Sequence, residues 1–349
     1  MDDMSKLKFD KSFTNQEPIP EEGIQRAVGI LKSGKLHRYN LDEKEIGDVS
    51  HLESEFSRWQ GVDFCLACTS GGYALQLALR AIGVKQGDQI LANAYTLAPV
   101  AGAIHNVGAL PILVEIDQNY HIDLEDLYSK AVSSGSKFLL LSHMRGHIVD
   151  MNKLLKICVE LDICLIEDCA HTMGAKWDGK RSGNFGKVSV FSTQTYKHIN
   201  SGEGGFLTTN DEEIAAIAVI LSGSYMLYER HGAIPSKESF DKVRLSSPNY
   251  SGRMDQLRAS ILRVQLPRLE ENIVRWNRLY QKLFKNLSKV EGITIPDRVD
   301  KEFYVGSSIQ FRLEDLNENL IIKFIKNCNK RGVEIKWFGD KNPSSYTSR

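Results

Sequence analysis

The fold and the chemistry of this chain are predicted from one segment, Lys187-Val-Ser-Val-Phe-Ser192-Thr-Gln-Thr-Tyr-Lys197-His-Ile-Asn-Ser-Gly-Glu-Gly-Gly205. Its β-branched beginning is typical of a buried strand, and the strand ends in small hydroxyl residues. Lys197 follows the strand and precedes a glycine-rich turn. Lysine side chains in polar loops are normally exposed to solvent and have no further role. An amine at the end of a buried strand, however, can lose its proton. It can then act as a Schiff-base nucleophile.

A second segment, Ile163-Cys-Leu-Ile-Glu-Asp168-Cys-Ala-His171, is an apolar strand that ends in an acid. Asp168 falls at the carboxyl end of a predicted parallel strand, where α/β sheets bind their ligands. The acid could also be an ordinary helix N-cap. Beside a Schiff-base lysine it has a specific use, because a carboxylate keeps the pyridine nitrogen of pyridoxal phosphate protonated.

Strand and helix signals alternate between residues 64 and 167. Continuous apolar strands between amphipathic helices indicate an α/β fold, with a mainly parallel sheet covered on both faces. The predicted strands are Phe64–Cys68, Gln89–Ala94, Pro111–Glu115, Lys137–Ser142 and Ile163–Glu167, and the predicted helices are Ala74–Ile82, Ala98–Val107, Leu124–Val132 and Met151–Leu161.

The chain is expected to have three parts: an N-terminal arm (1–20), a large cofactor-binding domain (21–252), and a long helix with a small α+β domain (253–349). The long helix is predicted over Arg253–Leu287, where Pro267 can introduce a kink. Residues 222–247 show little periodicity and are interpreted as a surface excursion. In the small domain we expect strands at Ile293–Ile295, Ser307–Phe311 and Val333–Phe338 and a helix at Leu320–Arg331.

The composition narrows the choice of partners. Lys and Arg number 44 and Asp and Glu also 44, so the formal net charge is zero and nothing favours nucleic acid or an anionic membrane. The polar N-terminus lacks the apolar core of a signal peptide, and no apolar run approaches the roughly 20 residues of a membrane span. A cytoplasmic protein is therefore expected.

The six cysteines do not indicate a disulfide framework, since the chain is long and has no secretory signal. Cys65 and Cys68 form a C-x-x-C, but no second Cys/His pair at ligand spacing accompanies it. No metal site is predicted.

The junction Ser70-Gly71-Gly72, between the first strand and its helix, fits a phosphate site. Glycines let backbone N–H groups come close, and a helix N-terminus favours an anion. A plain glycine-rich turn also fits these residues and, from them alone, is the favoured interpretation. Neither G-x-G-x-x-G nor a Walker A pattern is present, so nicotinamide binding and nucleotide hydrolysis lack their fingerprints.

Five segments together resemble the DegT/DnrJ/EryC1/StrS aminotransferases, a family of pyridoxal-phosphate-dependent sugar aminotransferases of fold type I. The resemblance extends from about Gly34 to about Phe338, in the order and spacing of the family. The five segments are Thr69–Leu79, Glu167–His171, Ser192–Lys197, Gly202–Gly205 and Asn249–Ala259.

The resemblance implies a role for each residue that lies on a matched motif. Lys197 would carry pyridoxal 5′-phosphate and then act as general acid and base, Asp168 would hold the pyridinium, and His171 would lie by the ring. Gly71 and Gly72 take positions where backbone amides hold the cofactor phosphate.

Two further matches concern the phosphate. Ser192 matches a hydroxyl that binds it in the family. Asn249 matches an asparagine that reaches across a two-fold interface to the neighbouring subunit's cofactor. The resemblance thus implies a homodimer with shared active sites.

The chain departs from the family at a few places. Leu97 stands where an aromatic residue usually covers the cofactor, which gives up a stacking contribution of about 1 kcal/mol; Tyr95 is two residues away. Arg145 also stands where an aromatic is common, and could bind a substrate anion or be an ordinary surface residue. The polar segment Gly339–Arg349 ends where the family continues, which suggests a short or incomplete member.

The predicted function is transfer of an amino group to a keto-sugar, with glutamate as the donor implied by the resemblance. One alternative is a sugar dehydratase, although the dehydratases similar to this family have histidine in place of Lys197. Another is a catalytically silent paralogue, which Leu97 and the short C-terminus favour and Lys197 and Asp168 oppose. The sugar and its reacting carbon are not predicted.

Overall fold

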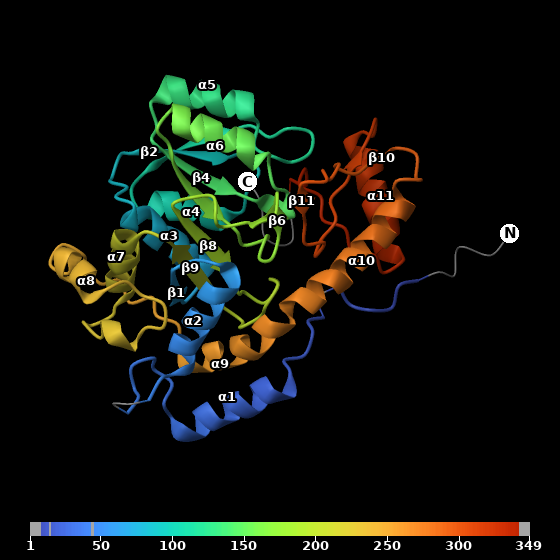
Figure 1. Cartoon of the computed structure of the whole chain (residues 1–349). Coiled ribbons are helices and arrows are strands. Elements are labelled where there is room, and N and C mark those ends of the chain that lie inside the picture. The colour runs from blue at the N-terminus through green and yellow to red at the C-terminus, as the bar shows by residue number, and fades with distance from the viewer. Residues whose placement is uncertain (1–7, 14, 43–44, 342–349) are drawn as a thin grey trace.

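The computed structural model describes residues 8–13, 15–42 and 45–341, so residues 1–7 of the expected arm and the polar end from residue 342 lie outside it. Within these ranges the centre is a seven-stranded sheet in the order β1-β9-β8-β5-β4-β2-β3 (Figure 1). The strands run parallel except β9, which is antiparallel to β1 and β8. The predicted mainly parallel α/β sheet is confirmed. Its strands are β1 (Phe64–Cys68), β2 (Gln89–Asn93), β3 (Leu110–Val114), β4 (Phe138–Ser142), β5 (Cys164–Asp168), β8 (Val188–Ser192) and β9 (Gly205–Thr209).

Helices cover both faces of this sheet. Successive side chains of a strand point to opposite faces, so in β4 Leu139 and Leu141 join one hydrophobic cluster and Leu140 joins another. The first cluster includes side chains of α2 (Asp48–Gln60), α5 (Leu124–Ser134), α6 (Met151–Glu160) and α9 (Gln256–Gln265), and the second those of α3 (Gly71–Ala81), α4 (Ala98–Asn106) and α7 (Glu212–Ser222).

Three of the helices between the strands begin directly after an aspartate that caps them. Asp123, Asp150 and Asp211 precede α5, α6 and α7, and each carboxylate accepts hydrogen bonds from backbone N–H groups of the first turn. These bonds satisfy donors that lack a partner within the helix. The caps thus fix where these three helices begin.

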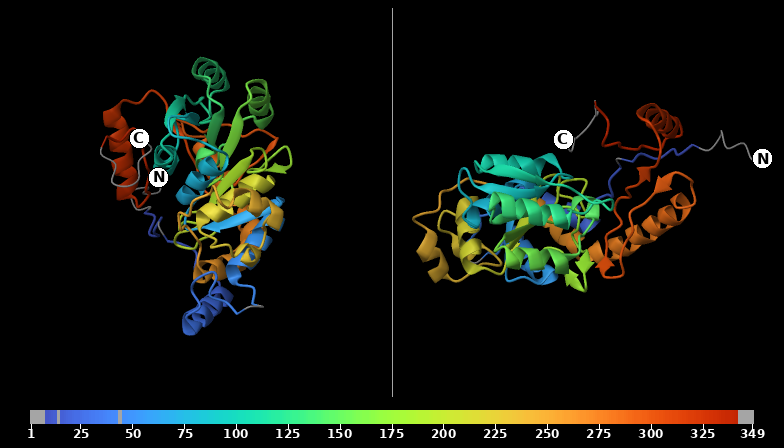
Figure 2. Two further views of the ribbon diagram at one scale, coloured as in Figure 1. Left: turned by 90° about the vertical axis from the view of Figure 1, so that its left-hand side faces the viewer. Right: turned by 90° about the horizontal axis from the view of Figure 1, so that it is seen from above.

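The predicted long helix is interrupted at Pro267. It consists of α9, a 3-10 turn at Leu266–Arg268 and α10 (Leu269–Leu287), because proline lacks the N–H that a continuous helix needs. α9 packs on α1 (Glu21–Ser33) and α2, whereas α10 extends away from the sheet towards α11 (Glu318–Lys330), as Figure 2 shows. The division of the chain at residue 252 stays a prediction.

The C-terminal unit differs from the prediction. Residues 307–311 and 333–338 are not strands. Next to them, Gly306 N–H donates to the side-chain Oδ1 of Asn277 in α10 at 2.6 Å, and Val333 N–H donates to the Cys328 carbonyl in α11 at 3.0 Å. The strands present are short: β10 (Ile293–Thr294) pairs with β12 (Arg312–Leu313), and β11 (Glu302–Phe303) joins β6 (Lys176–Trp177) and β7 (Lys180–Arg181).

The excursion at residues 222–247 is more regular than predicted. It contains a 3-10 turn at Tyr228–Arg230 and the helix α8 (Lys237–Val243). Phe240 is buried and its ring stacks on Tyr228 with 4.0 Å between centroids. This packing against α7 orders a segment whose own periodicity is weak.

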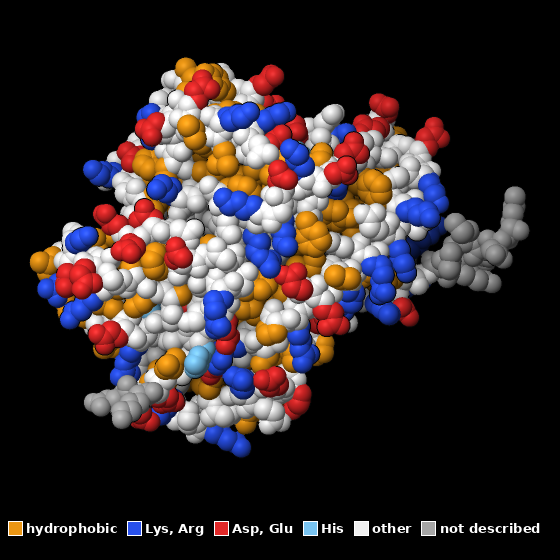
Figure 3. Space-filling view, viewed as in Figure 1, with side chains coloured by type: hydrophobic (Ala, Val, Ile, Leu, Met, Phe, Trp, Pro, Cys, Tyr) orange, Lys and Arg blue, Asp and Glu red, His pale blue; other side chains and the backbone are white. Residues whose placement is uncertain are grey.

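The surface carries both signs of charge. Acidic and basic side chains are interspersed over the face shown in Figure 3, in keeping with the zero net charge. Among the helices of the described ranges, none combines the length and apolar character that a membrane crossing requires.

Candidate active site

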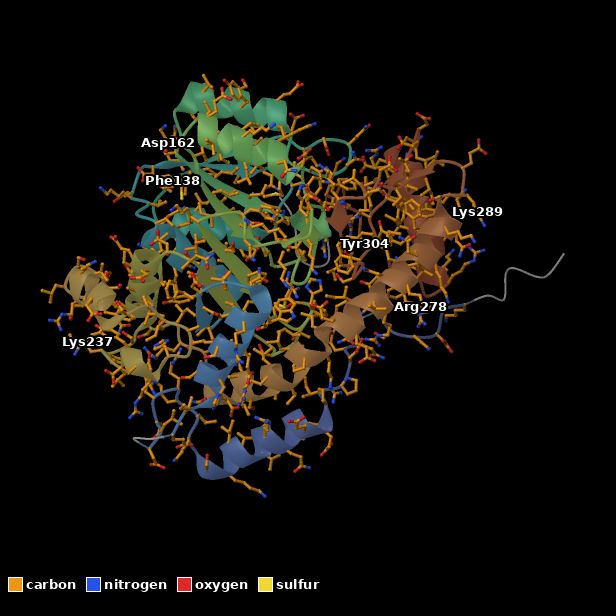
Figure 4. All side chains as sticks on the ribbon, in the orientation of Figure 1. Phe138, Asp162, Lys237, Arg278, Lys289 and Tyr304 are labelled. Carbon is orange, nitrogen blue, oxygen red and sulfur yellow. The ribbon has the colours of Figure 1, made fainter. Side chains whose placement is uncertain are left out.

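Polar side chains gather where β4, β5 and β8 end. Ser142, the last residue of β4, pairs in register with Asp168, the last residue of β5, and Asp168 pairs with Val190 of β8. The strands begin at the other edge: in Figure 4, Phe138 and Asp162, near the starts of β4 and β5, lie across the sheet from Tyr304. A ligand at the carboxyl edge would therefore meet side chains from several strands.

Asp168 is held by its neighbours in this row. The residue is 8% exposed, its Oδ2 accepts the Ser142 hydroxyl proton at 3.1 Å, and its Oδ1 accepts the Ala170 N–H at 3.1 Å. Asn93 at the end of β2 bonds both backbone groups of Ser142, donating to its carbonyl at 2.8 Å and accepting its N–H at 2.9 Å. The carboxylate thus has a defined orientation at the sheet edge.

The sequence interpretation missed Ser142. It is a small hydroxyl residue at the end of an apolar strand, as Ser192 is at the end of β8, and that pattern could have identified it. The bond to Asp168 makes it a supporting residue of the site.

Lys197 lies in the connection between β8 and β9. The connection continues the ladder of these strands, because Thr193 N–H donates to the Gly204 carbonyl at 2.9 Å and Thr195 N–H to the Gly202 carbonyl at 3.0 Å. Lys197 at its tip is half-buried. The antiparallel ladder returns the chain into the sheet, and so holds the lysine over the strand ends.

The amine of Lys197 contacts His171, its Nζ lying 2.9 Å from His171 Nε2. The other ring nitrogen, Nδ1, accepts the backbone N–H of Arg145 at 3.3 Å. A neutral imidazole that accepts at Nδ1 carries its proton on Nε2. Nε2–H then donates to Lys197, which must be an unprotonated amine to accept it.

The electrostatics make the neutral amine easier to reach than for a lysine in water. Burial lowers the pKa of Lys197 to about 8, with the charge of Asp168 raising it and that of Arg145 lowering it. Burial, together with the charges of Lys197 and Arg145, keeps the pKa of His171 well below its ordinary value. An amine with this pKa can exchange a proton near neutral pH.

The glycine-rich junction forms a concave turn beside Ser192. Ser70 caps α3 by accepting the Tyr73 N–H at 3.1 Å. A β-carbon on Gly71 would lie 2.9 Å from Ser192 Cβ, whereas one on Gly72 would meet Pro99 at an ordinary 3.6 Å. The missing β-carbon of Gly71 lets the N-terminus of α3 approach the Ser192 backbone, which brings helix N–H donors and a hydroxyl together.

The loop before α4 adds two relevant groups. The Thr96 hydroxyl is buried and has no hydrogen-bond partner within the part of the chain that the structure describes. Leu97 follows it at the N-cap position of α4 and is half-buried, while the Tyr95 ring packs on Tyr120 at 5.5 Å and on Phe338 at 5.1 Å. Tyr95 is therefore engaged in an aromatic cluster with the C-terminal segment.

Asn249 lies on the surface. Its Oδ1 accepts the Ser251 N–H at 2.9 Å and the Ser251 hydroxyl at 3.1 Å. The same segment contacts the junction before α3, since the Gly252 carbonyl accepts the Thr69 N–H at 3.0 Å. The structure thus brings Lys197, His171 and Asp168 together, places Gly71 against Ser192, and leaves Asn249 exposed.

The residues present fit pyridoxal 5′-phosphate. They offer an amine with a lowered pKa, an oriented carboxylate at the strand ends, and N–H donors and hydroxyls suited to a phosphate. The unpartnered Thr96 hydroxyl is a further polar group in this region.

Comparisons with known proteins give consistent matches. The family model described as the DegT/DnrJ/EryC1/StrS aminotransferase family matches residues 19–339. 3-Amino-5-hydroxybenzoate synthase of Amycolatopsis mediterranei is 31% identical over 312 residues, covering 88% of this chain and 75% of that protein. GDP-perosamine synthase of Caulobacter vibrioides is 32% identical over 232 residues, covering 66% of this chain and 59% of that protein.

Solved structures show the same architecture. The crystal structure of 3-amino-5-hydroxybenzoic acid synthase superimposes with a TM-score of 0.78 at 28% identity, over 92% of this chain and 80% of that one. GDP-4-keto-6-deoxymannose-3-dehydratase, solved with pyridoxal phosphate and glutamate trapped in it, gives a TM-score of 0.80 at 21% identity, over 93% and 85%. The second likeness supports the fold alone.

Proposed function

Because the chain belongs to the DegT/DnrJ/EryC1/StrS aminotransferase family, we propose that it transfers an amino group from an amino-acid donor to a keto-sugar. The cofactor of this aminotransferase is pyridoxal 5′-phosphate. The observation that carries the proposal is the Lys197 amine, which lies 2.9 Å from His171 Nε2 and whose pKa is lowered to about 8. The named amino-sugar enzymes among its relatives support a keto-sugar as acceptor.

The cofactor, when bound, supplies an electron sink for the charge that develops at the reacting carbon. Asp168, oriented by Ser142, would keep the pyridine nitrogen protonated. Gly71, Gly72 and Ser192 would hold the phosphate through the N-terminus of α3 and a hydroxyl. Leu97 would cover one face of the ring.

Lys197 would hold the cofactor covalently and then serve as the acid and base of the reaction. A group whose pKa lies near the working pH can both accept and return a proton. His171 positions the Lys197 amine and favours its neutral form by donating from Nε2. A lysine able to carry out proton transfer also favours transamination over dehydration for this chain.

We also propose a homodimer in which Asn249 contributes to the partner's phosphate site. Support comes from its exposed position, which leaves its side chain accessible to a second subunit. The cytoplasmic location stays a prediction.

The test of the proposed function is a mapping experiment. Purified protein loaded with pyridoxal phosphate is reduced with borohydride, and peptide mass mapping is expected to find the pyridoxyl group on Lys197. Adding glutamate to the unreduced enzyme should convert the cofactor to pyridoxamine phosphate. Lys197→Ala should abolish both signals, and the matched control Lys187→Ala, at an exposed lysine before β8, should leave them intact. A pyridoxyl group on another lysine would refute the assignment.

A further inference from the structure

The turn after β4 has an unusual backbone. Arg145, in the 3-10 turn Met144–Gly146, has φ 55° and ψ 21°, the left-handed region that residues other than glycine rarely adopt. Its neighbours Met144 and Gly146 are buried, while Arg145 itself is half-buried. Such a conformation is energetically unfavourable and persists only where the surroundings impose it, often at functional sites.

Hydrogen bonds on two sides impose this conformation. On the catalytic side, the Arg145 N–H donates to His171 Nδ1 at 3.3 Å. On the side of the C-terminal unit, the largely buried Arg298 donates from Nη1 to the Gly146 carbonyl at 2.8 Å. A β-carbon on Gly146 would lie 3.3 Å from the His171 carbonyl oxygen, so the backbone of the turn packs closely against the backbone of His171. Arg145 is therefore held in place beside the site.

The guanidinium of Arg145 acts on the catalytic pair. Its positive charge lowers the pKa of both Lys197 and His171. Asp168 is the one carboxylate among the described groups that shift Lys197, and in the proposed function it is committed to the pyridine nitrogen. Arg145 thus brings a positive charge close to the Lys197 amine.

We propose that Arg145 binds a carboxylate that a substrate carries next to its reacting carbon, and thereby determines substrate specificity. This inference rests on the proposed function. An amino donor has such a carboxylate on the carbon that bears the amino group, and a 2-keto sugar acid has one on the carbonyl carbon. A planar guanidinium matches a carboxylate with two parallel hydrogen bonds.

The two sources of carboxylate are separated by two pairs of probes on the loaded enzyme. The donor pair is L-glutamate and L-isoglutamine, in which an uncharged carboxamide replaces the α-carboxylate. The acceptor pair, given to the pyridoxamine-phosphate form, is 2-keto-D-gluconate and D-fructose, which differ in a carboxylate against a hydroxymethyl group at C1. For each pair the readout is the ratio of the two kcat/KM values.

Arg145→Gln is expected to reduce the preference for the carboxylate in one of the pairs by on the order of 10- to 100-fold, the loss of a charged hydrogen-bonded contact. Arg145→Lys should retain part of the preference, because lysine keeps the positive charge but cannot donate the two parallel hydrogen bonds of a guanidinium. The control Arg244→Gln, at a surface arginine paired with Asp241, should leave both ratios unchanged. A ratio within one variant cancels any effect on folding or on Lys197, since both probes meet the same protein.

The outcomes are distinct. A fall in the donor ratio assigns Arg145 to the amino donor, and a fall in the acceptor ratio assigns it to an acidic keto-sugar. Unchanged ratios in both pairs, with a wild-type enzyme that transaminates, overturn the inference and leave the proposed function standing. A wild-type enzyme that transfers no amino group from any donor overturns the proposed function, and with it this inference.

Discussion

Lys197 owes its pKa of about 8 to burial, which lowers it, and to two charges of opposite effect. Asp168 raises the pKa because a carboxylate favours the ammonium form, and Arg145 lowers it because two cations repel. The hydrogen bond donated by His171 Nε2–H also favours the neutral amine, because only the neutral amine can accept it. Asp168 ends β5 and His171 follows it three residues later, whereas Arg145 lies in the turn after β4.

We predict that Asp168→Asn lowers the pKa of Lys197 below about 8, since it removes the charge that raises it. The neutral fraction of the amine then reaches half at a lower pH, and the reactivity of Lys197 towards acetic anhydride rises earlier in a titration. Competitive acetylation of cofactor-free protein, followed by peptide mapping, measures this midpoint. Asp162→Asn, at a carboxylate that is 95% exposed, is the control. An unshifted midpoint would show that Asp168 does not face the amine.

Among the elements, α3 and the β8–β9 pair approach closely at the junction Ser70-Gly71-Gly72, which we propose as the phosphate site. Gly205 opens β9, and a β-carbon there would lie 2.6 Å from the Gly71 backbone nitrogen. Gly71 in turn packs on Ser192 at the end of β8. Two glycines thus allow three backbone segments to approach more closely than side chains would permit.

Gly71→Ala is predicted to destabilise the cofactor-free protein by about 1–3 kcal/mol, the usual effect of overpacking. Its β-carbon would lie 2.9 Å from Ser192 Cβ and 3.3 Å from Ser192 Cα, so backbone must shift. Gly72→Ala is the matched control, because its β-carbon meets only Pro99 at 3.6 Å. The free energies of unfolding of the two variants, measured by urea denaturation, test this prediction. Equal stabilities would mean that the close approach does not constrain the turn.

For the whole molecule, the decisive question is whether one chain completes the site of another. Asn249 is exposed on the described chain, and the oxygen of its side chain is engaged only locally with Ser251 among the bonds found there. In a two-fold dimer, a residue that crosses the interface crosses it twice. Each subunit would then complete its partner's site.

Mixing Lys197→Ala with Asn249→Ala and allowing subunit exchange tests this arrangement. If Asn249 acts across the interface, a mixed dimer carries both lesions in one site and a whole second site, and activity rises to about a quarter of wild type in a random mixture. The control pair is Lys197→Ala with Asp168→Asn, whose residues influence one another within one chain, and it should not recover. No recovery with Asn249→Ala, in dimers shown to have exchanged, would place its action within its own chain.

The strands and helices around the sheet were predictable because their signals are local. The apolar runs that became β1 to β5 and the aspartates that cap α5, α6 and α7 are features of consecutive residues. Strand β9 was not predicted, since its glycine-rich start resembled a turn. Residues 307–311 and 333–338 were wrongly predicted as strands, because apolar residues there lack a neighbouring strand to pair with.

The candidate site likewise has features that the sequence predicts and contacts that only the folded chain shows. The sequence alone determined that a lysine and an acid follow buried strands, and that glycines open the first helix. Only the tertiary structure decided that His171, 26 residues from Lys197, would contact its amine, and that Arg145 would direct a charge at both. It likewise decided that Arg38 and Glu53 would form a buried ion pair joining the loop before α2 to that helix. Secondary structure follows from the order of neighbouring residues, whereas contacts and pKa values depend on which distant groups packing brings together and on how much water it removes.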